Sequence, residues 1–257
     1  FLLLILVSKF SYKLKFVDIP NERKKHTKPT AYTGGLAISL IYVFSILLFD
    51  INEPKLNLIL SMAFLIAIVG FADDKWSLNA GGKLSLQIIP IIYMIVLLNL
   101  KINSLGNYNY FVISLNSFSI PFTLISVLLL INSCNYFDGL DGTLSFTSLS
   151  TFSILYFLTF DENVRLFLIL TSIPVCIFLC FNFSIFKLPK LFLGDSGSLL
   201  IGFIISFLLI YIENRNLVHP ILLGCSISLF VFEFISINLI RIKNKKDPFN
   251  PGNDHLH

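Results

Sequence analysis

Residues 197–212 read Gly-Ser-Leu-Leu-Ile-Gly-Phe-Ile-Ile-Ser-Phe-Leu-Leu-Ile-Tyr-Ile, without a single charged side chain. Apolar runs of this kind recur along the whole chain, and a helix needs about 20 mostly apolar residues to cross a bilayer. The runs are continuous and do not alternate between apolar and polar residues, so they favour membrane helices over an outer-membrane barrel. The sequence therefore predicts an all-α, polytopic integral membrane protein.

The apolar runs predict about nine spans, each of helical length or close to it. We expect them at residues 1–8, 34–50, 56–72, 84–100, 120–133, 143–160, 166–183, 197–212 and 219–240. The first run is too short for a full crossing, so we interpret it as the end of a truncated span. No soluble domain, long linker or repeat interrupts the runs. The sequence thus predicts one transmembrane domain over residues 1–257, incomplete at both ends.

The composition excludes several classes of protein. Apolar residues make up 55% of the chain and charged residues 13%, roughly half the charged fraction of a soluble domain. So few charges could not cover the surface of a soluble protein of this size. A cytosolic globular enzyme, a disordered chain and a nucleic-acid-binding domain are therefore excluded.

The charged residues lie mostly on one side of the predicted spans. All but four of the 19 Lys and Arg residues fall in the loops 9–33, 73–83, 132–142, 184–196 and 241–257. The positive-inside rule assigns these five loops to the cytoplasm. The net charge of +4 then reflects topology and anionic ligands, not nucleic acid. The longest loop of the other side, 101–119, contains residues 108–113, which could form a small hairpin.

Three acidic clusters lie at span ends on the predicted cytoplasmic side. They are Asp73-Asp74, the pair Asp138 and Asp141, and Asp195 in a Gly-Asp-Ser-Gly turn. Several carboxylates that converge would repel one another unless a cation lay between them, and oxygen ligands of this kind suit Mg²⁺ or Mn²⁺. The alternative interpretation is that these residues are solvated loop ends and helix caps.

Basic and His residues occur on the same side. Residues 23–28 read Arg-Lys-Lys-His-Thr-Lys, and a Thr- and Gly-containing turn follows at residues 29–35. Such a turn suits phosphate, although the charges alone also fit an anchor for anionic lipid. His255 and His257 in the tail could be phosphate donors, zinc ligands or neither. Together these features indicate phosphoryl-type chemistry on a substrate within the membrane.

The motifs resemble those of the polyprenyl-phosphate N-acetylhexosamine-1-phosphate transferase family (glycosyltransferase family 4). Any one of them is weak, but together, in order and on one predicted side, they are very specific. The matching stretches are Asp18–His26 with Gly34-Gly35, Gly70–Lys75, Lys83-Leu84 with Gln87, Asn132–Gly142, Phe192–Ser198 with Gly202, and Pro248–His257.

The resemblance implies an enzyme of the EC 2.7.8 type that transfers a sugar 1-phosphate from a UDP-sugar to undecaprenyl phosphate, releases UMP and uses Mg²⁺. Asp73 matches the position that deprotonates or positions the attacking lipid phosphate, and Asp74 matches its partner near the metal. Asp195 matches the Mg²⁺ ligand. The implied substrate contacts are Asn135, Asp138 and Asp141 for the nucleotide sugar, Phe192 for the uracil, His255 and His257 for the diphosphate, and Lys24, Lys28 and Thr30 as phosphate neighbours.

The tail, Asp254-His255-Leu256-His257, resembles the branch of the family that starts O-antigen, common antigen, teichoic acid or capsule synthesis at the bacterial inner membrane. UDP-GlcNAc is the default donor, and other UDP-N-acetylhexosamines remain open. The family also suggests a homodimer. The alternatives are the MurNAc-pentapeptide branch of peptidoglycan synthesis, a transporter or flippase of polyprenyl-linked sugars, and an inactive scaffold. A transporter would carry charged residues near the membrane midplane and on both sides.

Overall fold

A computed structural model describes residues 1–20, 28–49 and 51–244. The described chain is almost entirely helical, as predicted, with two short antiparallel strand pairs, β1–β2 and β3–β4. The elements are α1 (Leu2–Lys13), β1 (Val17–Asp18), β2 (Thr30–Ala31), α2 (Gly34–Leu48), α3 (Pro54–Trp76), α4 (Ala80–Ile92), η1 (Tyr93–Leu97), β3 (Ser104–Asn107), β4 (Val112–Ser114), η2 (Asn116–Phe118), α5 (Ser119–Phe137), α6 (Thr143–Leu158), α7 (Glu162–Asn182), η3 (Ile185–Lys187), α8 (Gly194–Asn214), α9 (Pro220–Ser226) and α10 (Ser228–Lys243).

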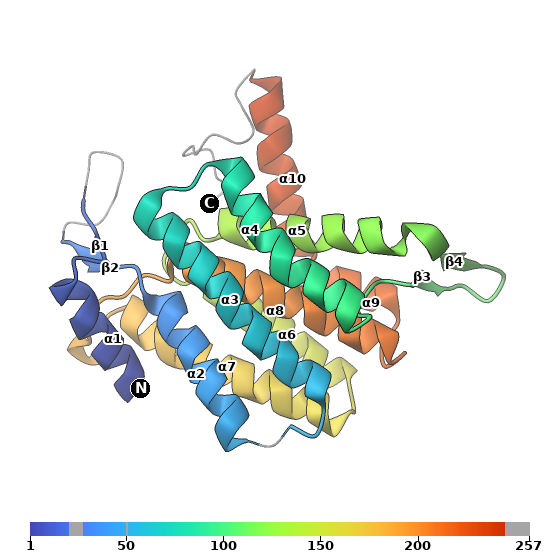
Figure 1. Ribbon diagram of the computed structural model, residues 1–257, viewed down its shortest axis with the longest axis horizontal. Coiled ribbons are helices and arrows are strands. Elements are labelled where there is room, and N and C mark those ends of the chain that lie inside the picture. The colour runs from blue at the N-terminus through green and yellow to red at the C-terminus, as the bar shows by residue number, and fades with distance from the viewer. Residues whose placement is uncertain (21–27, 50, 245–257) are drawn as a thin grey trace.

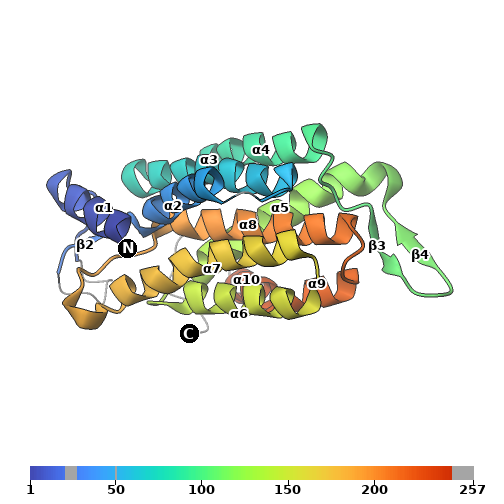
Figure 2. The ribbon, with the colours of Figure 1, turned by 90° about the horizontal axis from the view of Figure 1, so that it is seen from below.

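Helix α8 forms the core of the bundle. Every residue from Ser196 to Ile212 is buried, as expected of a helix that is apolar on all sides. Figure 2 shows α8 between a layer that contains α2, α3 and α4 and a layer formed by α6 and α7. The run that predicts a membrane helix most clearly from sequence is therefore the central helix, enclosed by protein on all its faces.

Glycines let the neighbouring helices approach α8 closely. A Cβ atom on Gly35 of α2 would overlap the backbone of Gly197, and one on Gly70 of α3 would overlap the carbonyl of Asp195. On the third side, a Cβ on Gly202 would lie 2.7 Å from Ile131 Cα of α5. Small residues are common where membrane helices pack, because they allow backbone contact. These crossings bring the ends of α3 and α5 next to the start of α8.

Five helices are long and apolar enough to cross a membrane by length and composition, or six if α9 and α10 form one bent span. The nine predicted apolar runs all correspond to helices, but the structure does not show about nine crossings. α2 and α6 are apolar but have 15 and 16 residues, and α1 has 12. Since a helix rises about 1.5 Å per residue, these three are short of a bilayer about 30 Å thick.

Two helices differ from the continuous spans that the sequence predicts. The predicted span 219–240 breaks between α9 and α10, which are bent by 62°, and Figure 1 shows α10 pointing away from the bundle. The predicted span 84–100 begins earlier, at Ala80, and changes to a π-helix at Tyr93. Pro90 lies inside α4 and lacks the N–H that a regular α-helix requires.

The two ends of the bundle gather different loops, as Figure 1 shows. At one end, Ala31 of β2 forms a bridge with Leu191, and the ends of α3, α5 and α8 meet. At the other end lies the β3–β4 hairpin, in which Tyr108–Phe111 form the turn. Arg215 at this end contacts Glu53 and Asp161 at 3.2 and 3.8 Å.

Candidate functional site

Asp73 and Asp74 lie in the last turn of α3 and take different partners. Ser77 ends the helix in a left-handed conformation with φ of 49°, so the chain turns back and the amide of Leu78 donates to Asp73 Oδ1 at 2.8 Å. Asp74 points to the start of α8. Its Oδ1 and Oδ2 accept the backbone N–H groups of Asp195 and Ser196 at 3.0 and 3.3 Å.

Asp74 thereby caps a helix to which it does not belong. The first N–H groups of an α-helix have no partner within the helix, and the positive end of the helix dipole favours an anion there. The approach is close: Gly194 has a φ of +73°, and a Cβ atom at this position would lie 2.7 Å from Asp74 Oδ2. The Gly-Asp-Ser-Gly turn therefore fixes Asp195 relative to the end of α3.

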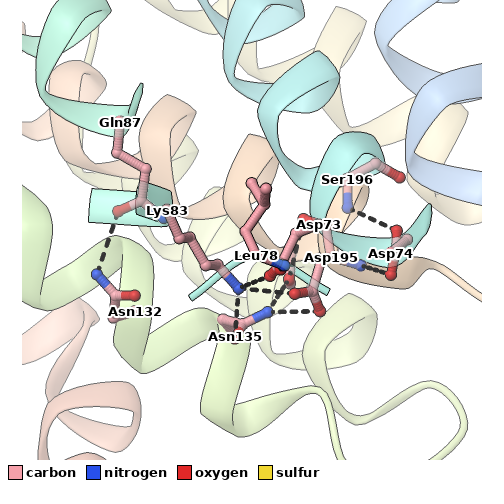
Figure 3. A network of polar contacts seen from close by, with 10 residues as sticks. Asp73, Asp74, Leu78, Lys83, Gln87, Asn132, Asn135, Asp195 and Ser196 are labelled. Carbon is pink, nitrogen blue, oxygen red and sulfur yellow. Dashed lines mark hydrogen bonds and ion pairs between the residues drawn. The ribbon is translucent and has the colours of Figure 1, made fainter. Parts of the chain in front are cut away.

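Lys83 of α4 is the centre of the cluster (Figure 3). Its Nζ lies 2.7 Å from Asp73 Oδ2 and 2.6 Å from Asp195 Oδ2, and it donates to Asn135 Oδ1 at 3.4 Å. The side chains of Lys83 and Asp73 are only 14% and 12% exposed. One ammonium thus forms ion pairs with two carboxylates from helices that are far apart in the sequence.

Asn135 joins α5 to the same cluster. Its Nδ2 donates to Asp195 Oδ1 at 2.9 Å and to Ser198 Oγ at 2.8 Å. Asp195 therefore has one oxygen on the amide of Asn135 and the other on the ammonium of Lys83. These contacts hold the Asp195 carboxylate in one orientation.

Asp138 and Asp141 follow α5 in the turn that leads to α6. Burial, together with the negative charges of Asp195 and Asp141, raises the pKa of Asp138 to about 8. Within the described chain no side chain or amide donates a hydrogen bond to its carboxylate. Asp141 instead pairs with Lys190 at 2.6 Å, and the Lys190 ammonium lies 5.3 Å from the centre of the Phe192 ring. Asp141, Lys190 and Phe192 form a second group beside the Lys83 cluster.

The segment before α2 borders this second group. Phe192 N donates to Ala31 O at 2.8 Å, and Gly34 N donates to Phe192 O at 3.0 Å. Thr30 is buried and donates through Oγ1 to Lys28 O at 3.1 Å, whereas Lys28 is exposed. Lys24, His255 and His257 lie outside the described residues.

Hard oxygen atoms surround one cationic position in the cluster. Asp73, Asp195 and Asn135 each direct an oxygen at Lys83 Nζ. Among the described residues, no three His, Cys, Asp or Glu side chains form a group that could hold a metal ion. The oxygen atoms around the Lys83 ammonium are carboxylate and amide oxygens, which are the kind of ligand that a divalent cation such as Mg²⁺ prefers.

Sequence reasoning indicated the carboxylates and Asn135 but not the central role of Lys83. A lysine at the start of an apolar run is explained equally well by the positive-inside rule, so its charge alone is no signal. Lys83 does lie in one of the stretches that resemble the family, but that resemblance did not indicate a role for it. Ser198, one helical turn after Asp195, was also missed.

The fold and the site together define a multi-pass helical membrane protein with an ion-paired carboxylate cluster at one end of its bundle. The model of a known family, described as "Glycosyl transferase family 4", matches residues 56–213. This stretch runs from the beginning of α3 almost to the end of α8 and includes every described residue of the Lys83 cluster. The chain belongs to this family.

Curated relatives match nearly the whole chain. An undecaprenyl-phosphate alpha-N-acetylglucosaminyl 1-phosphate transferase from Yersinia pestis is 28% identical over 99% of this chain and 72% of its own length. The protein of the same name from Escherichia coli K12 is 28% identical over 100% of this chain and 72% of its own. A probable undecaprenyl-phosphate N-acetylglucosaminyl 1-phosphate transferase from Bacillus subtilis is 29% identical over 98% and 71%.

Proposed function

We propose that this protein transfers an N-acetylhexosamine 1-phosphate, most simply GlcNAc 1-phosphate, from a UDP-sugar to undecaprenyl phosphate. An oxygen of the lipid phosphate attacks the phosphorus bonded to the sugar, and a new P–O bond forms. The P–O bond to UMP breaks, and UMP leaves with the bonding electron pair. The product is a lipid-linked sugar diphosphate, the first membrane intermediate of a cell-surface polysaccharide.

One observation carries this proposal. The chain belongs to glycosyl transferase family 4, and its Asp73, Asp195 and Asn135 converge on a single cationic position where three membrane helices end. Phosphoryl transfer requires charge neutralisation and positioning more than covalent chemistry by the protein. We expect the end of a bundle of membrane helices to lie near the lipid headgroups, where a lipid phosphate and a soluble nucleotide meet. The names of the relatives support GlcNAc as the sugar.

The residues divide into two groups by substrate. Asp73 positions or deprotonates the lipid phosphate, because its cluster is built on membrane helices α3, α4, α5 and α8. Asn135, Asp138, Asp141 and Phe192 serve the nucleotide sugar, with Phe192 against the uracil. Lys24, Lys28, Thr30, His255 and His257 contribute phosphate contacts from the N-terminal segment and the tail.

Mg²⁺, which Mn²⁺ could replace, fits the donor set of the cluster. Asp195 and Asp74 are the ligands that the sequence favours. Around Lys83 Nζ the oxygen donors are Asp73, Asp195 and Asn135, whereas both oxygens of Asp74 accept N–H groups of α8. When bound, the ion holds the carboxylates ionised and stabilises charge on the diphosphate. Lys83 forms ion pairs with Asp73 and Asp195, and Asp74 holds the first turn of α8 in place.

The remaining predictions on topology belong to the same proposal. The end of the bundle with the Lys83 cluster faces the cytoplasm of a bacterial cell, where UDP-sugars are made, in the inner membrane. The shorter helices α1, α2 and α6 complete about nine crossings, possible where the bilayer thins or a helix extends. The protein acts as a homodimer.

A transfer assay with purified protein tests the proposal. Radiolabelled UDP-GlcNAc, UDP-GalNAc and UDP-MurNAc-pentapeptide are each supplied with undecaprenyl phosphate, with and without Mg²⁺. We expect lipid-linked label from UDP-GlcNAc that depends on both lipid and metal, and at least about a hundredfold less from the Asp195→Asn variant. Transfer from UDP-MurNAc-pentapeptide alone would assign the protein to peptidoglycan synthesis. No transfer from any donor, with movement of polyprenyl-linked sugars across vesicles, would indicate a flippase instead.

A further inference from the structure

The part of α4 that carries Lys83 has very little buried surface. Of the residues of this helix, only Gln87, Pro90 and Ile91 are buried. The first turn of the helix contains Gly81 and Gly82, and its N-terminus is stabilised by Asn79, whose Oδ1 accepts the Gly82 amide at 2.6 Å. Between this cap and Pro90, Gln87 is the single buried side chain. The position of Lys83 therefore depends on what Gln87 contacts.

Gln87 contacts the neighbouring helix at a polar atom (Figure 3). Its Oε1 accepts a hydrogen bond from Asn132 Nδ2 of α5 at 3.4 Å, and Asn132 also donates to Leu128 O at 2.7 Å. Gln87 follows Lys83 by four residues, and Asn132 precedes Asn135 by three. Residues at these spacings lie on the same face of a helix. The amide pair is thus one helical turn from the contact of Lys83 with Asn135, between the same two helices.

The amide of Gln87 is energetically unfavourable at this buried position. It is 0% exposed, and within the described chain its Nε2 has no hydrogen-bond partner. A buried amide with an unsatisfied donor destabilises the fold relative to an apolar side chain of the same length. The surrounding helices lie in the membrane, where apolar residues are the rule. A side chain selected for packing alone would be apolar here.

We propose that Gln87 is a positioning residue for the transfer reaction, which pairs with Asn132 to fix α4 against α5 and so holds Lys83 between Asp73 and Asp195. The inference rests on the proposed function for its kinetic test. Within the described chain, the side chain of Gln87 makes no hydrogen bond to Lys83, Asp73 or Asp195. It acts through the register of the two helices.

The kinetic test compares three variants of the full chain. Gln87→Met keeps the length of the side chain but replaces the amide with an apolar group. We expect kcat to fall about tenfold or more, because a small misplacement of a reacting group lowers the reaction rate strongly. The KM for the UDP-sugar should change by less than about threefold, because the variant removes no group that binds the UDP-sugar. The exchange Gln87→Asn with Asn132→Gln keeps one amide on each helix and should restore most of kcat. Ser85→Ala, on the exposed part of α4, is the control and should match the wild type.

A second measurement does not depend on turnover. In a background with the four native cysteines replaced by alanine, Lys83→Cys and Asn135→Cys are joined by a short bifunctional thiol reagent. Gln87→Met should slow this crosslinking, and the exchanged pair should restore its rate. An unchanged crosslinking rate, or an unchanged kcat in Gln87→Met, would overturn the inference. If the wild type itself transferred no sugar phosphate, the proposed function would fail, while the crosslinking rate would still decide the role of Gln87.

Discussion

Replacement of Lys83 by methionine tests the organisation of the site most severely. The change removes the ammonium that lies 2.7 Å from Asp73 and 2.6 Å from Asp195, but it keeps an unbranched side chain of similar length. Two carboxylates then face each other without compensation at a position where Lys83 and Asp73 are 14% and 12% exposed. Loss of one partner from a buried ion pair costs about 3–5 kcal/mol.

Part of this cost can be avoided, because Asp73 and Asp195 can take up a proton or a metal ion when the ammonium is absent. We therefore expect a loss of turnover of about a hundredfold to a thousandfold, the scale of one strong electrostatic contact in the transition state. Incorporation of radiolabelled sugar phosphate into lipid measures turnover, and thermal unfolding in detergent measures stability.

Lys187→Met is the matched control for Lys83→Met. Lys187 is an exposed lysine near the same end of the bundle, so its loss changes net charge equally without touching the cluster. We expect this variant to retain wild-type turnover. If Lys83→Met had the same turnover as Lys187→Met, the view that the ammonium organises the carboxylates would be refuted.

Three further predictions follow from single contacts. Asp195→Asn should reduce turnover by at least about a hundredfold and weaken its Mg²⁺ dependence; equal turnover across a Mg²⁺ titration would remove Asp195 from the metal site. Asp138 has its pKa raised from 3.8 to about 8, so between these pH values the folded protein keeps a proton that the unfolded chain loses, and stability falls as pH rises. The gain in Tm from Asp138→Asn should thus be small near pH 4 and grow up to about pH 8, and a gain independent of pH would contradict the raised pKa. Gly35→Ala should destabilise the protein by about 1–3 kcal/mol, because its Cβ would overlap Gly197, whereas Gly224→Ala, with no atom within 4 Å of the added Cβ, should have no such effect.

The sequence was sufficient for the helical class and for most of the polar cluster. Continuous apolar runs specify membrane helices because the bilayer requires internal hydrogen bonding of the backbone. Carboxylates at the ends of such runs indicate a functional site, because packing alone does not account for a charge at these positions. Asp73 and Asp195 were found in this way and Asn135 through the resemblance to the family, and the structure brings all three within contact of one lysine.

Other features depend on contacts that no local pattern contains. Asp74 caps α8 from α3, a partnership between residues 121 positions apart. Lys83 lies in a stretch that resembles the family, but its pairing with two carboxylates from other helices is seen only in the structure. The break between α9 and α10 lies inside an apolar run without proline at the bend, so hydropathy alone predicts one continuous span.

The central claim is tested most directly by the stoichiometry of one reaction. Purified protein in detergent or nanodiscs receives UDP-GlcNAc, undecaprenyl phosphate and Mg²⁺, and both UMP and the lipid-linked sugar diphosphate are quantified. The account predicts that the two products appear in a ratio of about one to one, as transfer to the lipid phosphate requires, and that neither forms when the lipid phosphate is omitted. Release of UMP without a lipid-linked product, or the complete absence of both, would contradict it.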